Sequence, residues 1–134
     1  MNQDQEHLRL LSIFHYAVGG LTALAACFPC IHLFLGIALV SGAFPVQPGD
    51  QAPPPIVGWM FISIASVLIL AGWTLAIAIF VAGRFLARRT HYMYCFVVAA
   101  IECLFMPLGT ILGVFTIIVL VRPSVKALFQ PVVA

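Results

Sequence analysis

The sequence predicts an all-α integral membrane protein, a small bundle of four transmembrane helices. Of its 134 residues, 63% are hydrophobic and only 7% are charged, and the mean hydropathy is +1.16. A soluble domain carries about 25% charged residues, so this chain lacks the polar groups that would cover its surface in water. Lipid is the solvent that this composition fits. The net charge of +2, without a basic run interleaved with aromatics, argues against a nucleic-acid partner.

The pattern predicts one transmembrane domain over residues 1–134. Its expected parts are spans at about 12–40, 56–83, 90–106 and 109–122, a proline-rich outer loop at 41–55 and an interfacial C-terminal segment at 123–134. The start of the chain is polar and partly acidic, and the apolar stretch after it is about twice as long as the core of a signal peptide. We therefore expect the first apolar segment to remain as an anchor.

The first span contains three residues that interrupt its apolar run, His15, Pro29 and His32. At about 1.5 Å per residue the span is about 42 Å long, more than the ~30 Å hydrocarbon core requires. Tilt and a kink at Pro29 would absorb the excess. The alternative, a reversal of the chain at Pro29, would invert every later segment.

Charge placement decides between these two readings. The span at 56–83 contains no charged residue, and the basic cluster Arg84, Arg88 and Arg89 follows it. Under the positive-inside rule this cluster faces the cytoplasm, so the loop at 41–55 lies outside and the N-terminus inside. The first segment then crosses once, and Pro29 is a kink.

The region 92–121 allows two readings. A hairpin that turns at Pro107 gives two short crossings and returns Arg122 and Lys126 to the cytoplasm. A single long, kinked helix gives three spans instead and places Glu102 near the bilayer centre, where a carboxylate costs roughly 2.5–3.5 kcal/mol. The hairpin is the expectation, with both termini cytoplasmic.

Cys27 and Cys30 form a Cys-x-x-Cys motif, a spacing used in thiol–disulfide exchange. Haem attachment needs a histidine directly after the second cysteine, but Ile31 stands there, and a zinc site needs about four ligands. Quinone-linked disulfide enzymes need a second pair to relay electrons. We expect both cysteines to be reduced and to pack as small apolar residues, with redox as the alternative.

Ionisable residues inside a span are functional hypotheses by default. His15 and His32 are about 25 Å apart along one helix, so they do not share one haem iron, but each can bind a separate tetrapyrrole or a quinone. Glu102 is the only acidic residue in the apolar segments. It is a candidate proton relay, ion ligand or partner for a basic side chain of another subunit, or a cap of the outer turn.

Small residues recur at a spacing of one helical turn. Gly109 and Gly113 form a Gly-x-x-x-Gly motif, which lets another helix backbone approach closely. The same theme recurs in three further pairs: Gly19 with Ala23, Gly72 with Ala76, and Ala78 with Ala82. These faces indicate tight packing, either within the bundle or against another protein.

No catalytic triad, phosphate-binding loop or metalloprotease motif occurs in the chain. The sequence therefore predicts a non-enzymatic accessory or structural subunit that packs in the membrane against a larger complex. Its expected partners are membrane lipids and other membrane-protein subunits or copies of itself, and it requires no metal or cofactor. The alternative is a membrane protein that binds haem, chlorophyll or a quinone, or a thiol-redox protein, using His32, Cys27, Cys30 or Glu102.

The segments 107–116 (PLGTILGVFT) and 122–129 (RPSVKALF) resemble the C-terminal signature of small, uncharacterised bacterial four-span membrane proteins, and residues 7–20 are similar too. The resemblance implies a location in the bacterial inner membrane and favours the hairpin topology. It implies no activity.

Overall fold

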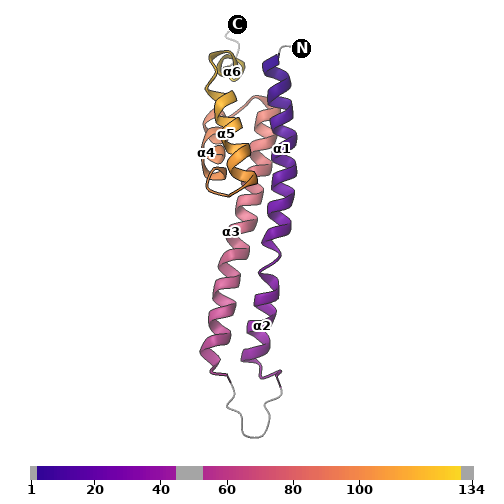
Figure 1. The fold of residues 1–134 in the computed structure, drawn as a ribbon, viewed down its shortest axis with the longest axis vertical. Helices are drawn as coiled ribbons and strands as arrows, with labels where there is room; N and C mark the ends of the chain where they lie inside the picture. The colour runs from indigo at the N-terminus through magenta and orange to yellow at the C-terminus, as the bar shows by residue number, and fades with distance from the viewer. Residues whose placement is uncertain (1–2, 45–52, 131–134) are drawn as a thin grey trace. The chain divides into compact units, whose positions relative to one another are not determined.

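The computed structural model describes residues 3–44 and 53–130, and within them every regular element is an α-helix. In chain order the helices are α1 (Gln3–Ala26), α2 (Cys30–Val40), α3 (Pro55–Arg88), α4 (Tyr92–Glu102), α5 (Leu108–Val121) and α6 (Pro123–Leu128) (Figure 1). The all-α prediction is confirmed for these residues. Most of the expected outer loop and the last four residues lie outside the described part of the chain.

A short turn at Cys27–Pro29 separates α1 from α2. Proline has no N–H, and its ring clashes with the carbonyl of residue i−4, so the helical ladder stops there. It resumes at once, because Leu33 N–H donates to the carbonyl of Pro29 at 3.0 Å. The chain continues in the same direction (Figure 1), so the interruption is a kink and not a reversal.

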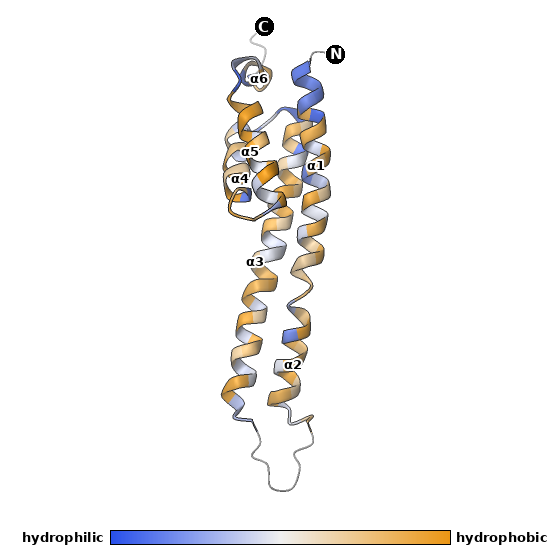
Figure 2. Ribbon diagram, viewed as in Figure 1, coloured by the Kyte–Doolittle hydropathy of each residue, from blue (hydrophilic) through white to orange (hydrophobic). Residues whose placement is uncertain are grey.

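Two helical stretches in the described residues are long and apolar enough to cross a membrane. They run from Gln3 to Val40 and from Pro55 to Arg88, with 38 and 34 residues, and most of their ribbon has the hydrophobic colours in Figure 2. Only 11% and 17% of the residues in their most apolar stretches are buried. The core helix of a soluble protein would be mostly buried, so this exposure fits lipid as the surrounding solvent.

The other two apolar helices are too short for a full crossing. Helices α4 and α5 have 11 and 14 residues, which corresponds to lengths of about 16 and 21 Å. A hydrocarbon core of about 30 Å requires about 20 residues. The predicted four-span bundle is therefore not confirmed. The structure shows a helical protein with two candidate membrane spans.

The chain divides into two compact units. Unit 1 comprises Met1–Leu21 and Leu75–Ala134, and unit 2 comprises Thr22–Thr74. In unit 1, α4 and α5 lie side by side and run in opposite directions, joined by a turn at residues 103–107 (Figure 1). A continuous helix through this region, the three-span alternative, is thereby excluded. The apolar core of unit 1 is formed by Leu8, Leu11, Leu86, Cys95, Leu112, Val119, Leu120 and Val125.

Unit 2 packs α2 against the first part of α3 through glycines. A Cβ atom on Gly36 would lie 2.8 Å from the carbonyl oxygen of Gly58, and one on Gly58 would lie 3.0 Å from that of Gly36. A Cβ on Gly72 would meet Ala26 at 2.7 Å. Only the absence of side-chain atoms allows backbones to approach this closely. The contact between Gly36 and Gly58 was not predicted. The two glycines lie on different helices, so no regular spacing along one helix indicates it.

Candidate functional site

A buried ionisable pair lies inside unit 1. The side chains of His15 on α1 and Glu102, the last residue of α4, are 0% and 1% exposed, and His15 Nε2 lies 3.3 Å from Glu102 Oε2. Glycines on the other two helices make room for this pair. A Cβ on Gly83 of α3 would lie 3.1 Å from His15 Cβ, and one on Gly109 of α5 would lie 2.6 Å from the Glu102 carbonyl oxygen.

Most polar groups around this pair have hydrogen-bond partners. The hydroxyl groups of Ser12 and Thr116, both buried, donate to the carbonyls of Gly83 and Leu112 at 2.7 Å. The Glu102 carboxyl differs, because Oε1 has no hydrogen-bond partner in the described part of the chain. The distance from Oε2 to His15 Nε2 is that of an ion pair, yet the same two atoms do not meet hydrogen-bond geometry. We therefore treat the contact as electrostatic.

This geometry changes the roles expected for His15 and Glu102. The His15 ring is fully enclosed, and its Nδ1 lies 2.8 Å from the Leu11 carbonyl oxygen while Nε2 faces Glu102. It therefore has no open face for a tetrapyrrole. The Glu102 side chain is buried and faces His15 of the same chain, so it is not an exposed cap of the turn. His15 and Glu102 are far apart in the sequence, so no spacing along the chain predicted that they would face each other.

His32 lies in unit 2 and has the opposite environment. Its side chain is exposed, and its ring stacks on Phe61 with centroids 6.1 Å apart and planes inclined by 12°. Within the described residues the structure shows no hydrogen bond to this ring. A cavity of about 300 Å³ beside it is lined mainly by apolar side chains: Phe28, Met60, Phe61, Ile64 and Leu68. The predicted ligand residue His32 thus lies on an apolar surface with an adjoining cavity.

The predicted redox residues lie in the turn after α1 and at the start of α2. All four cysteines are free thiols, and Cys27 Sγ donates to the Ala23 carbonyl oxygen at 3.4 Å. No cluster of three or more histidine, cysteine or acidic residues suited to a metal ion occurs among residues 3–44 and 53–130. This arrangement offers neither a disulfide nor a second pair to exchange electrons with.

The Gly-x-x-x-Gly face of α5 packs within the chain. A Cβ on Gly113 would clash with the Ala99 carbonyl oxygen of α4 and lie 2.7 Å from Cys103 Sγ. A Cβ on Gly19 of α1 would lie 3.4 Å from side-chain atoms of Ile79 and Phe80 of α3, which is an ordinary packing distance. Of the other predicted small residues, Ala76 is buried and Ala23 half-buried. Gly109 and Gly113 thus serve the α4–α5 contact within unit 1.

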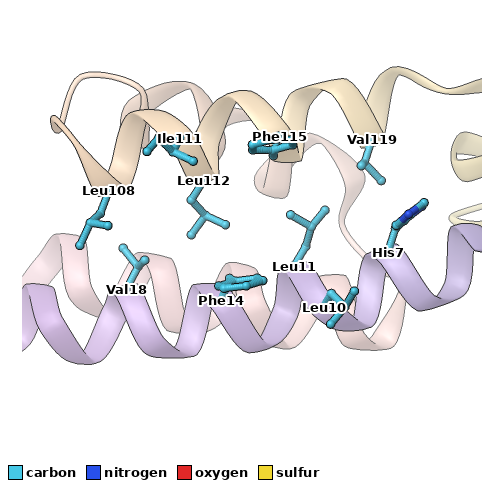
Figure 3. Close-up of a pocket in the computed structure, with 10 residues that line it drawn as sticks. All are labelled: His7, Leu10, Leu11, Phe14, Val18, Leu108, Ile111, Leu112, Phe115 and Val119. Carbon is cyan, nitrogen blue, oxygen red and sulfur yellow. The ribbon is translucent and has the colours of Figure 1, made fainter.

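Unit 1 also holds an apolar groove of about 380 Å³ between α1 and α5 (Figure 3). Its lining is apolar except for His7, which lies at one end of the groove in Figure 3, and His7 Nδ1 is buried without a hydrogen-bond partner among the described residues. The lining includes Leu10, Phe14, Val18, Ile111 and Phe115. Such a lining suits a hydrocarbon chain.

No protein-family model, curated protein or solved structure matches this chain. We therefore argue its function from composition and geometry. The resemblance of segments 107–116 and 122–129 to bacterial membrane proteins stays a prediction.

Proposed function

We propose that this protein is a small, non-enzymatic accessory subunit that packs within the membrane against a larger membrane-protein complex. Its two candidate spans expose large apolar side chains along their length, including Phe34, Ile56, Val67 and Leu70. A lipid environment is sufficient to explain why these side chains are exposed. The observation that favours a protein neighbour is the exposed imidazole of His32.

An exposed histidine in water is hydrated, but hydrocarbon supplies no hydrogen bonds. His32 lies on α2, in the C-terminal part of the first candidate span, on a surface of aromatic and aliphatic side chains. A polar group without a partner costs about 1–3 kcal/mol. A donor or acceptor from a neighbouring membrane protein would remove that cost. We therefore place the contact with the larger complex at His32 and its adjoining cavity.

The second candidate function, binding of a tetrapyrrole or quinone, rests on the same residue. The cavity beside His32 is apolar and open, as such a ring system requires. The other residues considered for this role contribute less. His15 and Glu102 face each other, and Cys27 and Cys30 are thiols without a second pair.

Replacing His32 by phenylalanine tests both functions. The change keeps an aromatic ring beside Phe61 but removes both nitrogens. We expect wild-type protein in mild detergent to migrate as a large complex on native gels, and His32→Phe to migrate as a small species of unchanged abundance. Phe34→Leu, an exposed apolar change on the same helix, is the control and should leave the complex intact.

An absorbance spectrum of the same samples separates the two functions. A visible band that is present in wild type and lost in His32→Phe would favour the cofactor. A wild-type protein that runs only as a monomer of 14.5 kDa plus detergent, without a band, would contradict both proposals.

We further propose that both termini and the Arg84–Arg89 segment face the cytoplasm of a bacterial inner membrane. The positive-inside rule supports the orientation, and the resemblance of the C-terminal segments supports the membrane. Helix α4 begins shortly after the basic cluster, and α5 leads back to Arg122 and Lys126. Since each arm is shorter than the hydrocarbon core, we propose a re-entrant hairpin in place of the third and fourth spans.

Cysteine labelling tests this topology. In a background without native cysteines, an impermeant aqueous reagent added outside should label a probe at Ala43 and spare probes at Met106 and Gln130. Opening the inner side should expose Gln130 but not Met106, because the hairpin tip lies in lipid. Labelling of Met106 from outside would restore the four-span topology. Labelling of Gln130 from outside would contradict the cytoplasmic C-terminus.

A further inference from the structure

We propose that the groove between α1 and α5 holds one acyl chain of a membrane phospholipid, with the phosphate or ester oxygens of that lipid at His7. The groove lies within unit 1 and shares no lining residue with the cavity beside His32. This inference is therefore independent of the accessory function. It rests on the lining, the length and the width of the groove, and on two polar groups at one of its ends.

The groove is apolar from its floor to its rim. Its floor is formed by core side chains that are almost fully buried: Leu11, Leu112 and Val119. Its rim is formed by side chains that are about half exposed, among them Leu10, Phe14, Ile111 and Phe115. Ordered water does not fill such a space, because a bound water needs two to four polar partners. In a bilayer the occupant that suits this lining is hydrocarbon.

The length of the groove matches the depth of one lipid leaflet. It extends from His7 to Val18 on α1 and from Val119 to Leu108 on α5 (Figure 3). Each stretch advances by 11 residues, which is about 16 Å at 1.5 Å per residue. Half of a ~30 Å hydrocarbon core is about 15 Å. A single acyl chain that enters at His7 would therefore reach the inner end of the groove.

The width of the groove fits an extended chain and is too small for a helix. A volume of about 380 Å³ divided by a length of about 16 Å gives a mean cross-section of roughly 24 Å². An α-helix with its side chains is about 10 Å across, which corresponds to roughly 80 Å². A helix of another protein, or of a second copy, would rest on the rim and leave the floor empty. A hydrocarbon chain, only one methylene wide, reaches the floor.

The end of the groove at His7 provides a polar group for the head of the lipid. His7 Nδ1 is buried and has no hydrogen-bond partner among residues 3–44 and 53–130. Leaving a buried polar atom without a partner is costly. With its hydrogen on Nδ1, the ring can donate to a phosphate or ester oxygen. Every other lining residue is apolar, so a lipid head fits at this end alone.

A basic side chain lies at the same end. Arg122 comes three residues after Val119, and its Nη1 atom lies 3.6 Å from Oδ1 of Asp4, which is three residues before His7. The Arg122 side chain is 45% exposed, and a guanidinium has five N–H donors. It can therefore bind a phosphate oxygen while it keeps its contact with Asp4, and arginine is well suited to phosphate. The charge at this end complements the phosphate of a phospholipid.

Native mass spectrometry of the full-length chain in mild detergent tests the site. The probe is dioleoyl phosphatidylglycerol, titrated into protein from which lipid has been removed. We expect one saturable lipid per chain, and a dissociation constant about tenfold higher for His7→Phe, which keeps an apolar ring but cannot donate a hydrogen bond. Dioleoylglycerol, which has the same chains without phosphate, should bind the wild type at least as weakly. Equal affinity of wild type and His7→Phe for the phospholipid would contradict recognition of its head at His7.

Blocking the groove is an independent test of the acyl-chain site. Leu108 is 53% exposed and its side chain is directed toward Val18 in Figure 3, so Leu108→Trp should narrow the inner end and weaken lipid binding. Leu70→Trp, at an exposed leucine on α3 outside the groove, is the matched control and should bind lipid as the wild type does. His32→Phe should also bind normally, which keeps this test separate from that of the accessory function.

Two results would overturn the acyl-chain site. One is lipid binding by Leu108→Trp that equals that of the wild type. The other is a wild-type dimer without bound lipid that Leu108→Trp dissociates, because a second copy would then cover the groove. Should Leu108→Trp not accumulate, the comparison of wild type with His7→Phe decides alone.

Discussion

Gly113→Ala is expected to destabilise the protein and lower its abundance in the membrane. The added Cβ would clash with the Ala99 carbonyl oxygen and lie 2.7 Å from Cys103 Sγ, so backbone and not a flexible side chain must move. Overpacking of a close contact costs about 1–3 kcal/mol, and this contact joins α5 to the end of α4. A thermal melt in detergent and the amount of protein in membranes measure the effect.

Gly20→Ala is the matched control for this change. Gly20 lies on α1 and would present a Cβ with nothing within 4 Å, so alanine should be neutral or stabilising there by its helix propensity. The comparison separates volume from the loss of glycine itself. If Gly113→Ala remained as stable as Gly20→Ala while a large complex dissociated on native gels, then Gly113 would contact another protein and not α4.

The second large effect on stability is expected when one member of the buried His15–Glu102 pair is removed. Glu102→Ala leaves His15 enclosed without its neighbour and opens space between α1 and α4. Breaking a buried pair in this way costs about 3–5 kcal/mol, so we expect a marked fall in melting temperature. Replacing both residues with leucine should recover part of the loss, because apolar side chains of similar size need no partner.

The exposed pair between Arg122 and Asp4 provides the control. These side chains are 45% and 22% exposed and lie 3.6 Å apart, and such surface pairs contribute about 0–1 kcal/mol. Asp4→Asn should therefore change the melting temperature little. A Glu102→Ala protein as stable as Asp4→Asn would mean that the His15 contact contributes no stability, and that water reaches the carboxyl.

The hairpin shows where reasoning from the sequence succeeded and where it failed. Proline and glycine around Pro107 predicted a turn, and α4 and α5 are separate antiparallel helices joined there. The same reasoning expected each arm to cross the bilayer, but Glu102 ends α4 after 11 residues. The apolar composition of the arms was visible in the sequence. How far the two arms enter the bilayer depends on the helices that they pack against.

By itself, the sequence determined the properties that depend on local chemistry. Its low charge and long apolar runs specified helices that expose hydrocarbon, and Pro29 interrupted the first of them because it cannot donate a backbone hydrogen bond. Local composition acts on residues that are neighbours in the chain, so these features follow without knowledge of the fold.

Only the tertiary structure decided which helix faces meet. His15 and Glu102 are far apart in the sequence, and so are Gly36 and Gly58, yet each pair is in contact. In lipid the apolar effect does not select one helix face over another, because every apolar face is equally soluble. Close backbone contacts and buried polar pairs supply that selection, and both depend on geometry between distant residues. The site at His15 therefore exists only when α1 and α4 come together.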